Sequence, residues 1–377
     1  MIDRRLLRDF DWVMLGLTLA LAGAGAVGVY SATHPEGGGA SPMFVDHVGR
    51  IALGFAALLV ATAVDYRVVL HWAWHGYALA LAALVAVDIF GMVGMGAQRW
   101  LSLGFVSIQP SEFFKLALVL VLARYFGGLK KPSPFSPGDL WPVALAAAVP
   151  FLLVLKQPDL GTALIIAGIF TAMLFVAGAE TRLFGTAGAA AAGIGAVLAI
   201  LGKLGIFNPL GMLREYQVRR IKVLFNPELD PLGAGYHISQ SKIAIGSGGL
   251  AGKGYLQGTQ SGLKFLPQQH TDFIFSVIAE EWGFAGSVVV ILLMVGLILW
   301  AVQTAYRARD FAGSLLAMGV ATVFALHCAV NIGMTTGIFP VVGIPLPLLS
   351  YGGSSVLVTF TGIGLVMNVK MRRFVYG

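Results

Sequence analysis

The segment from Phe265 to Phe275 carries the sharpest chemical signal of the sequence, because it delivers His270 and Asp272 to the start of a long apolar stretch. Ionisable groups at the mouth of an apolar helix bundle are costly unless they are paired or hydrated, so each is a candidate for function. Carboxylate and imidazole groups both transfer protons in enzymes. Helix chemistry alone explains Asp272 equally well as an N-cap of the following helix.

Other polar groups also lie at the ends of apolar stretches. Glu112 and Lys115 are three residues apart, so they share a helix face and can pair, as a purely structural ion pair would. Asp159 begins another stretch, where a role as N-cap or first-turn anion competes with a functional one. Together, Glu112, Lys115 and Asp159 would form a polar surface at the ends of neighbouring helices. The complete set is Arg99-Trp100, Gln109 to Lys115, Gln157 to Asp159, His270-Thr271-Asp272 and Ser350 to Ser355, which includes Ser354 and Ser355.

Two further features lie close to these groups. Glu280 and Glu281 follow Asp272 two turns deeper along the same apolar stretch, a position that requires a hydrated cavity or polar partners rather than lipid. The segment Pro340 to Ser355 is rich in Pro and Gly and is expected to form a rigid re-entrant loop before the last span. Irregular backbone at membrane depth is tolerated only against protein or water.

The elements that position these residues are predicted to be transmembrane helices. The chain has 377 residues, of which 57% are hydrophobic and only 11% are charged, whereas a soluble domain has about 25% charged residues. Its 49 glycines fit helices that pack closely in lipid. The apolar runs show no alternation of polar and apolar residues, which argues against a β-barrel. We therefore predict an all-α polytopic membrane protein, a single domain over residues 1–377.

About ten spans are expected, with a large extracytoplasmic loop, residues 207–272, between the seventh and the eighth. The loop opens with a mixed basic and apolar segment, residues 210–225, that suits a helix at the membrane interface. Headgroup anchoring alone would explain that segment equally well. The ten spans are about 12–32, 48–66, 72–90, 111–126, 140–155, 160–178, 183–206, 273–303, 310–336 and 345–369.

The distribution of cations predicts the orientation. With both termini in the cytoplasm, thirteen Lys and Arg residues face the cytoplasm and five face the exterior, leaving out the long loop. Two basic termini also require an even number of spans. The polar groups described above then lie at the exterior ends of the spans, so a reaction centre should open outward.

Several other functions have little support in the sequence. The net charge is +7, but the cations are distributed as expected from the membrane topology, so the charge does not indicate a nucleic-acid partner. The seven histidines are scattered without a metal-binding motif, and no Walker loop for ATP is present. The lone cysteine, Cys328, has no disulfide partner and is expected to be a small buried hydrophobe.

Four separated motifs, in order, resemble the SEDS (shape, elongation, division and sporulation) family over almost the whole chain. They are Gln109-Pro-Ser-Glu-Phe113, Gln157-Pro-Asp-Leu-Gly161, His270-Thr-Asp-Phe-Ile-Phe275 with Ala279-Glu-Glu281, and Leu348-Leu-Ser-Tyr-Gly-Gly-Ser-Ser355. The segments 235–241, 245–249, 252–254 and 258–261 are more similar to RodA members than to the division counterpart FtsW. One departure is Gln268, where the family has Glu.

The resemblance implies a peptidoglycan glycosyltransferase that polymerises lipid II outside the membrane during cell elongation. The 4-hydroxyl of one disaccharide attacks the anomeric carbon of another, undecaprenyl pyrophosphate leaves, and the configuration inverts. Asp272 matches the essential aspartate of the family and is the expected general base. A single-displacement reaction also needs positive charge at the leaving pyrophosphate.

The remaining site residues are expected to bind substrate. Cations of the long loop, Arg219, Arg220, Lys253 and Lys264, are candidates for the pyrophosphate. Lys115, with Glu112 and Asp159, would shape the cavity, and the neighbouring polar residues Arg99, His270, Thr271, Ser354 and Ser355 would complete it. The sequence identifies no cofactor, and a divalent cation, Mg²⁺ or Mn²⁺, is compatible with a pyrophosphate substrate.

The resemblance also implies partners and a location. A class B penicillin-binding transpeptidase and the elongation machinery would be the protein partners, in the bacterial inner membrane and among its lipids. Two alternatives remain at this point. A lipid II flippase or transporter would also be a polytopic bundle with buried acids, which Glu280 and Glu281 favour. A non-catalytic scaffold for the transpeptidase is the third interpretation.

Overall fold

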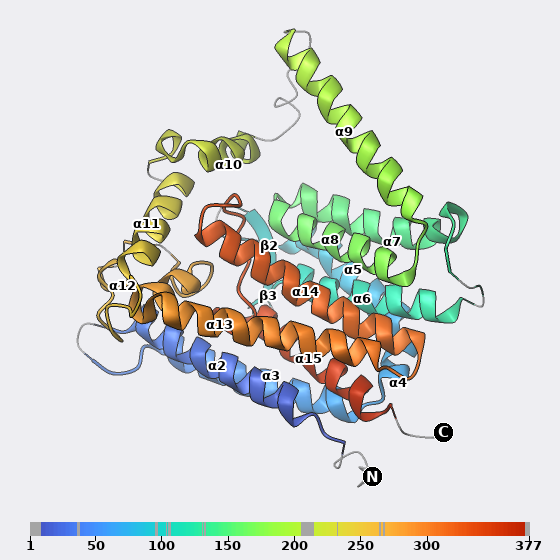
Figure 1. Ribbon diagram of the computed structural model, residues 1–377, viewed down its shortest axis with the longest axis horizontal. Helices are drawn as coiled ribbons and strands as arrows, with labels where there is room; N and C mark the ends of the chain where they lie inside the picture. Colours follow the sequence, from blue (N-terminus) through green and yellow to red (C-terminus); the bar gives the residue numbers. More distant parts are fainter. Residues whose placement is uncertain are drawn as a thin grey trace.

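The structure, a computed structural model, describes residues 9–35, 38–94, 97–102, 104, 107–129, 131, 133–204, 215–231, 233–263, 265–266 and 268–373. It is a bundle of long helices, with several of the shorter helices gathered at one end (Figure 1). The long helices are α2 (Trp12–Thr33), α3 (Pro42–Ala63), α5 (Ala73–Phe90), α6 (Pro110–Gly128), α7 (Pro137–Lys156), α8 (Leu160–Ala177), α9 (Thr181–Lys203), α13 (Ile274–Tyr306), α14 (Phe311–Thr335) and α15 (Gly353–Met371).

The predicted all-α membrane fold is confirmed. Nine of the described helices are long and apolar enough to cross a membrane, and α6 corresponds to the remaining predicted span. It is less apolar because it carries Glu112, Lys115 and Arg124. Its contacts with α5, α8 and α14 bury both faces, so neighbouring helices rather than lipid surround its ionisable groups.

The boundaries of two predicted spans were wrong. The second helix begins at Pro42 rather than near residue 48, because the Ser41 side chain caps it by accepting from the Phe44 amide at 3.1 Å. The last helix begins at Gly353 rather than near residue 345. The segment before it is irregular and runs against protein: the backbone of Leu348 and Leu349 lies so close to Gly25 that a side chain there would collide with it.

A small antiparallel sheet between α5 and α6 was not predicted. Its strands are β1 (Met92–Gly94), β2 (Ala97–Ser102) and β3 (Ser107–Ile108), in the order β1-β2-β3. Leu101 of β2 lies opposite Ile108 of β3. The sheet matters for the site because β2 carries Arg99.

The long loop between α9 and α13 forms its own helices, at the end of the bundle opposite the start of α2 and the end of α15 (Figure 1). These are α10 (Glu215–Phe225), the 3-10 helix η2 (Pro227–Leu229), α11 (Ala234–Ser247) and α12 (Thr259–Gly262). The expected interfacial segment 210–225 is therefore helical over its described residues. Helix α9 diverges from the bundle, and none of its span Thr181–Leu198 is buried against the described protein.

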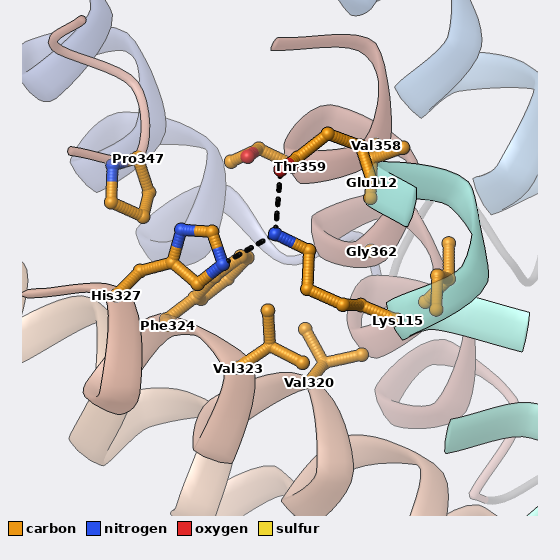
Figure 2. Close-up of a pocket in the computed structure, with 11 residues that line it drawn as sticks. Glu112, Lys115, Val320, Val323, Phe324, His327, Pro347, Val358, Thr359 and Gly362 are labelled. Carbon is orange, nitrogen blue, oxygen red and sulfur yellow. Dashed lines mark hydrogen bonds and ion pairs between the residues drawn. The ribbon is translucent and has the colours of Figure 1, made fainter. Parts of the chain in front are cut away.

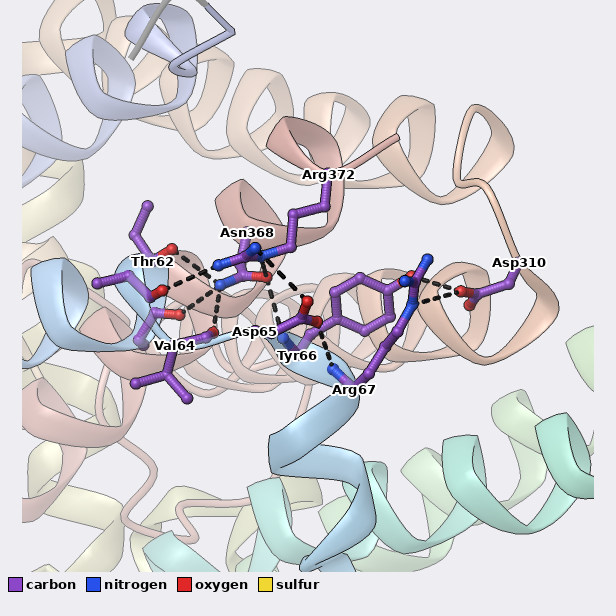
Figure 3. A network of polar contacts seen from close by, with 10 residues as sticks. Thr62, Val64, Asp65, Tyr66, Arg67, Asp310, Asn368 and Arg372 are labelled. Carbon is purple, nitrogen blue, oxygen red and sulfur yellow. Dashed lines mark hydrogen bonds and ion pairs between the residues drawn. The ribbon is translucent and has the colours of Figure 1, made fainter. Parts of the chain in front are cut away.

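Asn368 of α15 anchors the end of the bundle that carries the start of α2 and the end of α15 (Figure 3). Its amide nitrogen donates to the carbonyls of Ala61 at 3.0 Å and Thr62 at 2.8 Å, where α3 ends. Its amide oxygen accepts from the backbone N–H of Tyr66 at 3.1 Å, the first residue of α4 (Tyr66–His71). One fully buried side chain thus closes the α3–α4 turn onto α15.

Helix α13 is kinked at Gly283, whose φ of 65° is in the left-handed region. A Cβ at this position would lie 2.2 Å from the backbone nitrogen of Gly252. Glycine is needed here because it allows the kink, and because the absence of a side chain lets loop residues 250–252 pack directly on the helix.

Candidate functional site

Asp272 lies immediately before α13, at the end of the bundle that carries α10 to α12. The N-cap position of α13 is Phe273, and no side-chain cap hydrogen bond forms there among the described residues. The backbone carbonyl of Asp272 accepts from the Asn331 side chain of α14 at 2.9 Å. A Cβ added to Gly343 would lie 3.3 Å from Oδ2 of Asp272. The carboxylate is therefore not used as the helix cap, and the segment before α15 lies beside it.

The electrostatic surroundings of Asp272 suit an acid–base group. Burial raises the pKa of Asp272 to about 6, and the nearby charge of Asp159 raises it further, while Arg220 and Arg99 oppose the rise. A carboxyl with a pKa near 6 is mostly ionised at neutral pH and yet basic enough to accept a proton. Strongly perturbed carboxyls of this kind are typical of functional sites.

Asp159 and Arg99 form a charged pair next to Asp272. Asp159 caps α8 by accepting from the Thr162 amide at 3.1 Å, which confirms the N-cap prediction. Its other oxygen lies 3.6 Å from Nε of Arg99, and Arg99 also donates to the Pro158 carbonyl. Strand β2 and helix α8 thus bring together two residues that are 60 positions apart and that both act on the pKa of Asp272.

Glu112 and Lys115 form the predicted ion pair on α6, with 2.7 Å between Lys115 Nζ and Glu112 Oε1. Both side chains are buried. His327 of α14 lies at 2.7 Å on the other side of the ammonium, and the three border a small cavity (Figure 2). The imidazole joins the pair into a cluster of three titratable groups.

The candidate pyrophosphate cations have different positions. The charge of Arg220, on α10, opposes the rise in the pKa of Asp272, and its role at the pyrophosphate stays a prediction. Arg219 pairs with Asp230 of the same loop at 2.7 Å, and Lys253 pairs with Glu280 of α13 at 2.7 Å, so both cations already have an acidic partner. Lys264 lies outside the described residues.

Glu280 and Glu281 have polar partners within the protein. Glu280 accepts from the Lys253 ammonium at 2.7 Å and from the backbone amides of Gln260 at 2.9 Å and Ser261 at 3.1 Å. Glu281 accepts from the Ser31 hydroxyl of α2. The two acids hold the loop 253–261 and α2 against α13, and they no longer favour a transport pathway.

His270 and Thr271 connect the site to the segment before α15. The His270 carbonyl accepts from the Tyr351 amide at 2.8 Å, and the Thr271 carbonyl accepts from the Ser350 hydroxyl at 2.6 Å. Burial lowers the pKa of His270, which keeps its ring neutral at pH 7. These contacts fix the backbone that leads into Asp272.

Two serines at the start of α15 differ in position. Ser354 is buried, and its hydroxyl accepts from the Gln109 amide at 2.9 Å, which is a structural role. Ser355 is partly exposed. No contact of either serine with Asp272 is found within the described part of the chain.

The sequence analysis missed His327 and Asn331. His327 and Asn331 are ionisable or polar groups inside an apolar span, which is the signal that could have identified them. Their partners could not be identified in this way, since they lie on other helices. No three His, Cys, Asp or Glu side chains among the described residues are grouped to hold a metal ion.

Comparison with known proteins places this geometry in a family. Residues 11–374 match the FtsW/RodA/SpoVE family model, described as cell cycle protein. The chain is 43% identical over 365 residues to the peptidoglycan glycosyltransferase MrdB of Escherichia coli strain K12, a match that covers 96% of this chain and 94% of MrdB.

Two solved structures share the fold. One, described as showing the structural coordination of polymerization and crosslinking by a peptidoglycan synthase complex, contains a chain with 30% identity and a TM-score of 0.80, over 97% of this chain and 98% of that one. The rod shape determining protein RodA of Thermus thermophilus is 28% identical with a TM-score of 0.70, over 97% of this chain and 98% of RodA. This multi-pass membrane protein therefore belongs to the FtsW/RodA/SpoVE family, the SEDS family whose motifs its sequence carries, and resembles RodA-type members over almost its whole length.

Proposed function

We propose that Asp272 is the general base with which this peptidoglycan glycosyltransferase joins the disaccharide units of lipid II. The proposal is supported by the position of the Asp272 carboxylate, which lies beside Gly343 and near the charges of Arg99, Arg220 and Asp159. Burial raises the pKa of this carboxyl to about 6. Asp272 is the carboxylate among the described residues that has both a raised pKa and cations nearby. Its side chain neither caps a helix nor forms an ion pair within the described residues.

The proposed reaction is a single displacement. Asp272 takes the proton of the acceptor 4-hydroxyl while that oxygen attacks the anomeric carbon of the donor. The bond from this carbon to the pyrophosphate oxygen breaks, and undecaprenyl pyrophosphate leaves with both bonding electrons. Attack from the opposite face inverts the configuration from α to β.

The cations near Asp272 would stabilise the charge that develops on the pyrophosphate. Arg220 and Arg99 act on the same carboxyl, so an anion bound beside Asp272 would be attracted by both guanidinium groups. Inverting glycosidases use two carboxyl groups, one of which protonates the leaving group. A pyrophosphate leaves without protonation, so one carboxylate acting as base is sufficient.

We further propose that the site opens to the exterior and that both termini are cytoplasmic, as the cation distribution indicates. A class B penicillin-binding transpeptidase is the proposed partner. This proposal is supported by the similarity to a chain of a peptidoglycan synthase complex that coordinates polymerization with crosslinking.

The test compares the wild-type chain with Asp272→Asn, each purified with its transpeptidase partner and supplied with lipid II. The variant should lose about 100- to 10,000-fold of the polymerisation rate, the usual contribution of a general base. Equal folding and equal partner binding are the controls. Polymerisation by the variant at the wild-type rate would reject Asp272 as the base, and movement of lipid II across liposomes without polymer would indicate a flippase.

A further inference from the structure

His327 hydrogen bonds to two other elements of the fold. It lies on α14 and is only 3% exposed. Its Nε2 is 2.7 Å from Nζ of Lys115 on α6, and its Nδ1 is 3.2 Å from the carbonyl oxygen of Pro345, in the segment before α15. A single imidazole therefore connects the buried ion pair with the irregular segment that passes beside Asp272.

These two contacts fix the proton of the imidazole. A carbonyl oxygen can only accept, so Nδ1 must carry the proton and donate to Pro345. An ammonium can only donate, so Nε2 must present its lone pair to Lys115. A second proton on the ring would place two positively charged N–H groups against each other. The neutral form with the proton on Nδ1 is the one that fits.

Lys115 depends on this acceptor. Its side chain is 2% exposed, and the described part of the chain supplies its ammonium with two partners, Glu112 and His327. The cavity beside the ammonium measures about 20 Å³ and is lined mostly by apolar groups, among them Val323 and Phe324 (Figure 2). An ammonium that loses a hydrogen-bond partner in such surroundings must move to find another.

The contact of His327 with Pro345 lies close to a second set of hydrogen bonds, which involves the backbone of Asp272. Asn331 lies four residues further on, one turn along α14. Its Nδ2 donates to the Ile344 carbonyl at 2.7 Å and to the Asp272 carbonyl at 2.9 Å. His327 and Asn331 thus hold the consecutive carbonyls of Pro345 and Ile344, and Asn331 holds the backbone of Asp272 as well. The buried ion pair and the proposed base are connected through two side chains of one helix.

From this arrangement we propose that His327 is a positioning residue for glycan synthesis: it accepts from Lys115, holds the Glu112–Lys115 pair in place, and so sets the segment beside Asp272. It acts through Lys115 and Pro345 and does not touch the substrate. The inference rests on the proposed function of Asp272 and adds a residue outside the sequence motifs.

Three substitutions separate the two contacts. His327→Gln places an amide close to the position of Nε2 and keeps an acceptor for Lys115. His327→Asn places an amide close to the position of Nδ1 and keeps the donor to Pro345. His327→Leu removes both. Cys328→Ala, at the next position of α14, is the matched control, because the Cys328 thiol contacts Met294 rather than the cluster.

The measurements are kcat and KM for lipid II polymerisation by the full chain with its partner, together with the melting temperature. The contact with Lys115 should dominate, because a charged donor makes the stronger hydrogen bond. His327→Leu and His327→Asn should then lower kcat about tenfold at a nearly unchanged KM, as expected for misplaced catalytic geometry. His327→Gln should restore kcat to within about threefold of wild type, and Cys328→Ala should match wild type.

Other outcomes would overturn the proposal. A folded His327→Leu protein with the kcat of wild type would do so, and so would a His327→Gln protein as slow as His327→Leu. A lower melting temperature with unchanged kcat per folded molecule would show that the role is structural only.

A further measurement separates this inference from the proposed function. The melting temperatures of His327→Leu, Lys115→Met and the double variant form a mutant cycle that needs no activity. Coupling between the two positions is expected, and additive effects would reject the contact. If the wild-type chain fails to polymerise lipid II, the function proposed for Asp272 fails while the cycle still tests the contact.

Discussion

Replacing Asp159 with Asn should shift the pH dependence of glycan synthesis to lower pH. Burial raises the pKa of Asp272 from an ordinary value of 3.8 to about 6, which corresponds to a cost of about 3 kcal/mol for ionising this carboxyl. Since the base acts in its ionised form, kcat/KM should be half-maximal near pH 6 and fall about tenfold for each pH unit below that.

The direction of the shift follows from the charges around Asp272. Asp159 is a like charge that contributes to the raised pKa, whereas Arg99 opposes it. Asp159→Asn removes the like charge and frees Arg99, so the acid limb should move down by about half a pH unit. Asn is also a good N-cap, so the bond to the Thr162 amide and the start of α8 are retained. Arg99→Gln should move the limb up by about one pH unit.

The assay is kcat/KM for lipid II polymerisation by the purified complex from acid to neutral pH. Lys131→Gln is the control, because it removes a cation from an exposed pair with Asp139, outside the candidate site. Its profile should match wild type. Two results would refute the reasoning: pH profiles of the Asp159 and Arg99 variants that shift in the same direction, or a wild-type acid limb near pH 4. Non-specific damage to the site would not move the two profiles in opposite directions.

Two further predictions concern stability. Because the folded pKa of Asp272 is raised, its ionisation destabilises the fold as the pH rises from 3.8 to about 6. Asp272→Asn should therefore increase the free energy of unfolding at pH 7 by at most about 3 kcal/mol and raise the melting temperature accordingly. The gain should fall to about 0.5 kcal/mol at pH 4 and vanish at lower pH, so an equal gain at pH 7 and pH 4 would contradict this. Asn368→Ala leaves buried backbone groups at the α3–α4 turn unpaired, so it should cost about 1–3 kcal/mol. This cost would appear as a lower melting temperature with unchanged activity per folded molecule, and a wild-type melting temperature would show that the Asn368 contacts contribute nothing.

The sequence alone determined the class of the protein and the position of its polar motifs along the chain. Long apolar stretches and their flanking cations are local properties, so they predict helices and an orientation without knowledge of the packing. The pairing of Glu112 with Lys115 was also predictable, because residues three apart meet on any helix. Asp159 as the cap of α8 follows from the same local rules.

Only the tertiary structure decided which charges act on Asp272. Arg99 and Arg220 do so, although one lies on an unpredicted strand and the other on a loop helix. Lys253, from the same loop as Arg220, instead pairs with Glu280. His327 meets Lys115 across 212 positions of sequence. Such contacts depend on which helix faces pack together, and packing is set by the shapes of many side chains at once rather than by the spacing of a few.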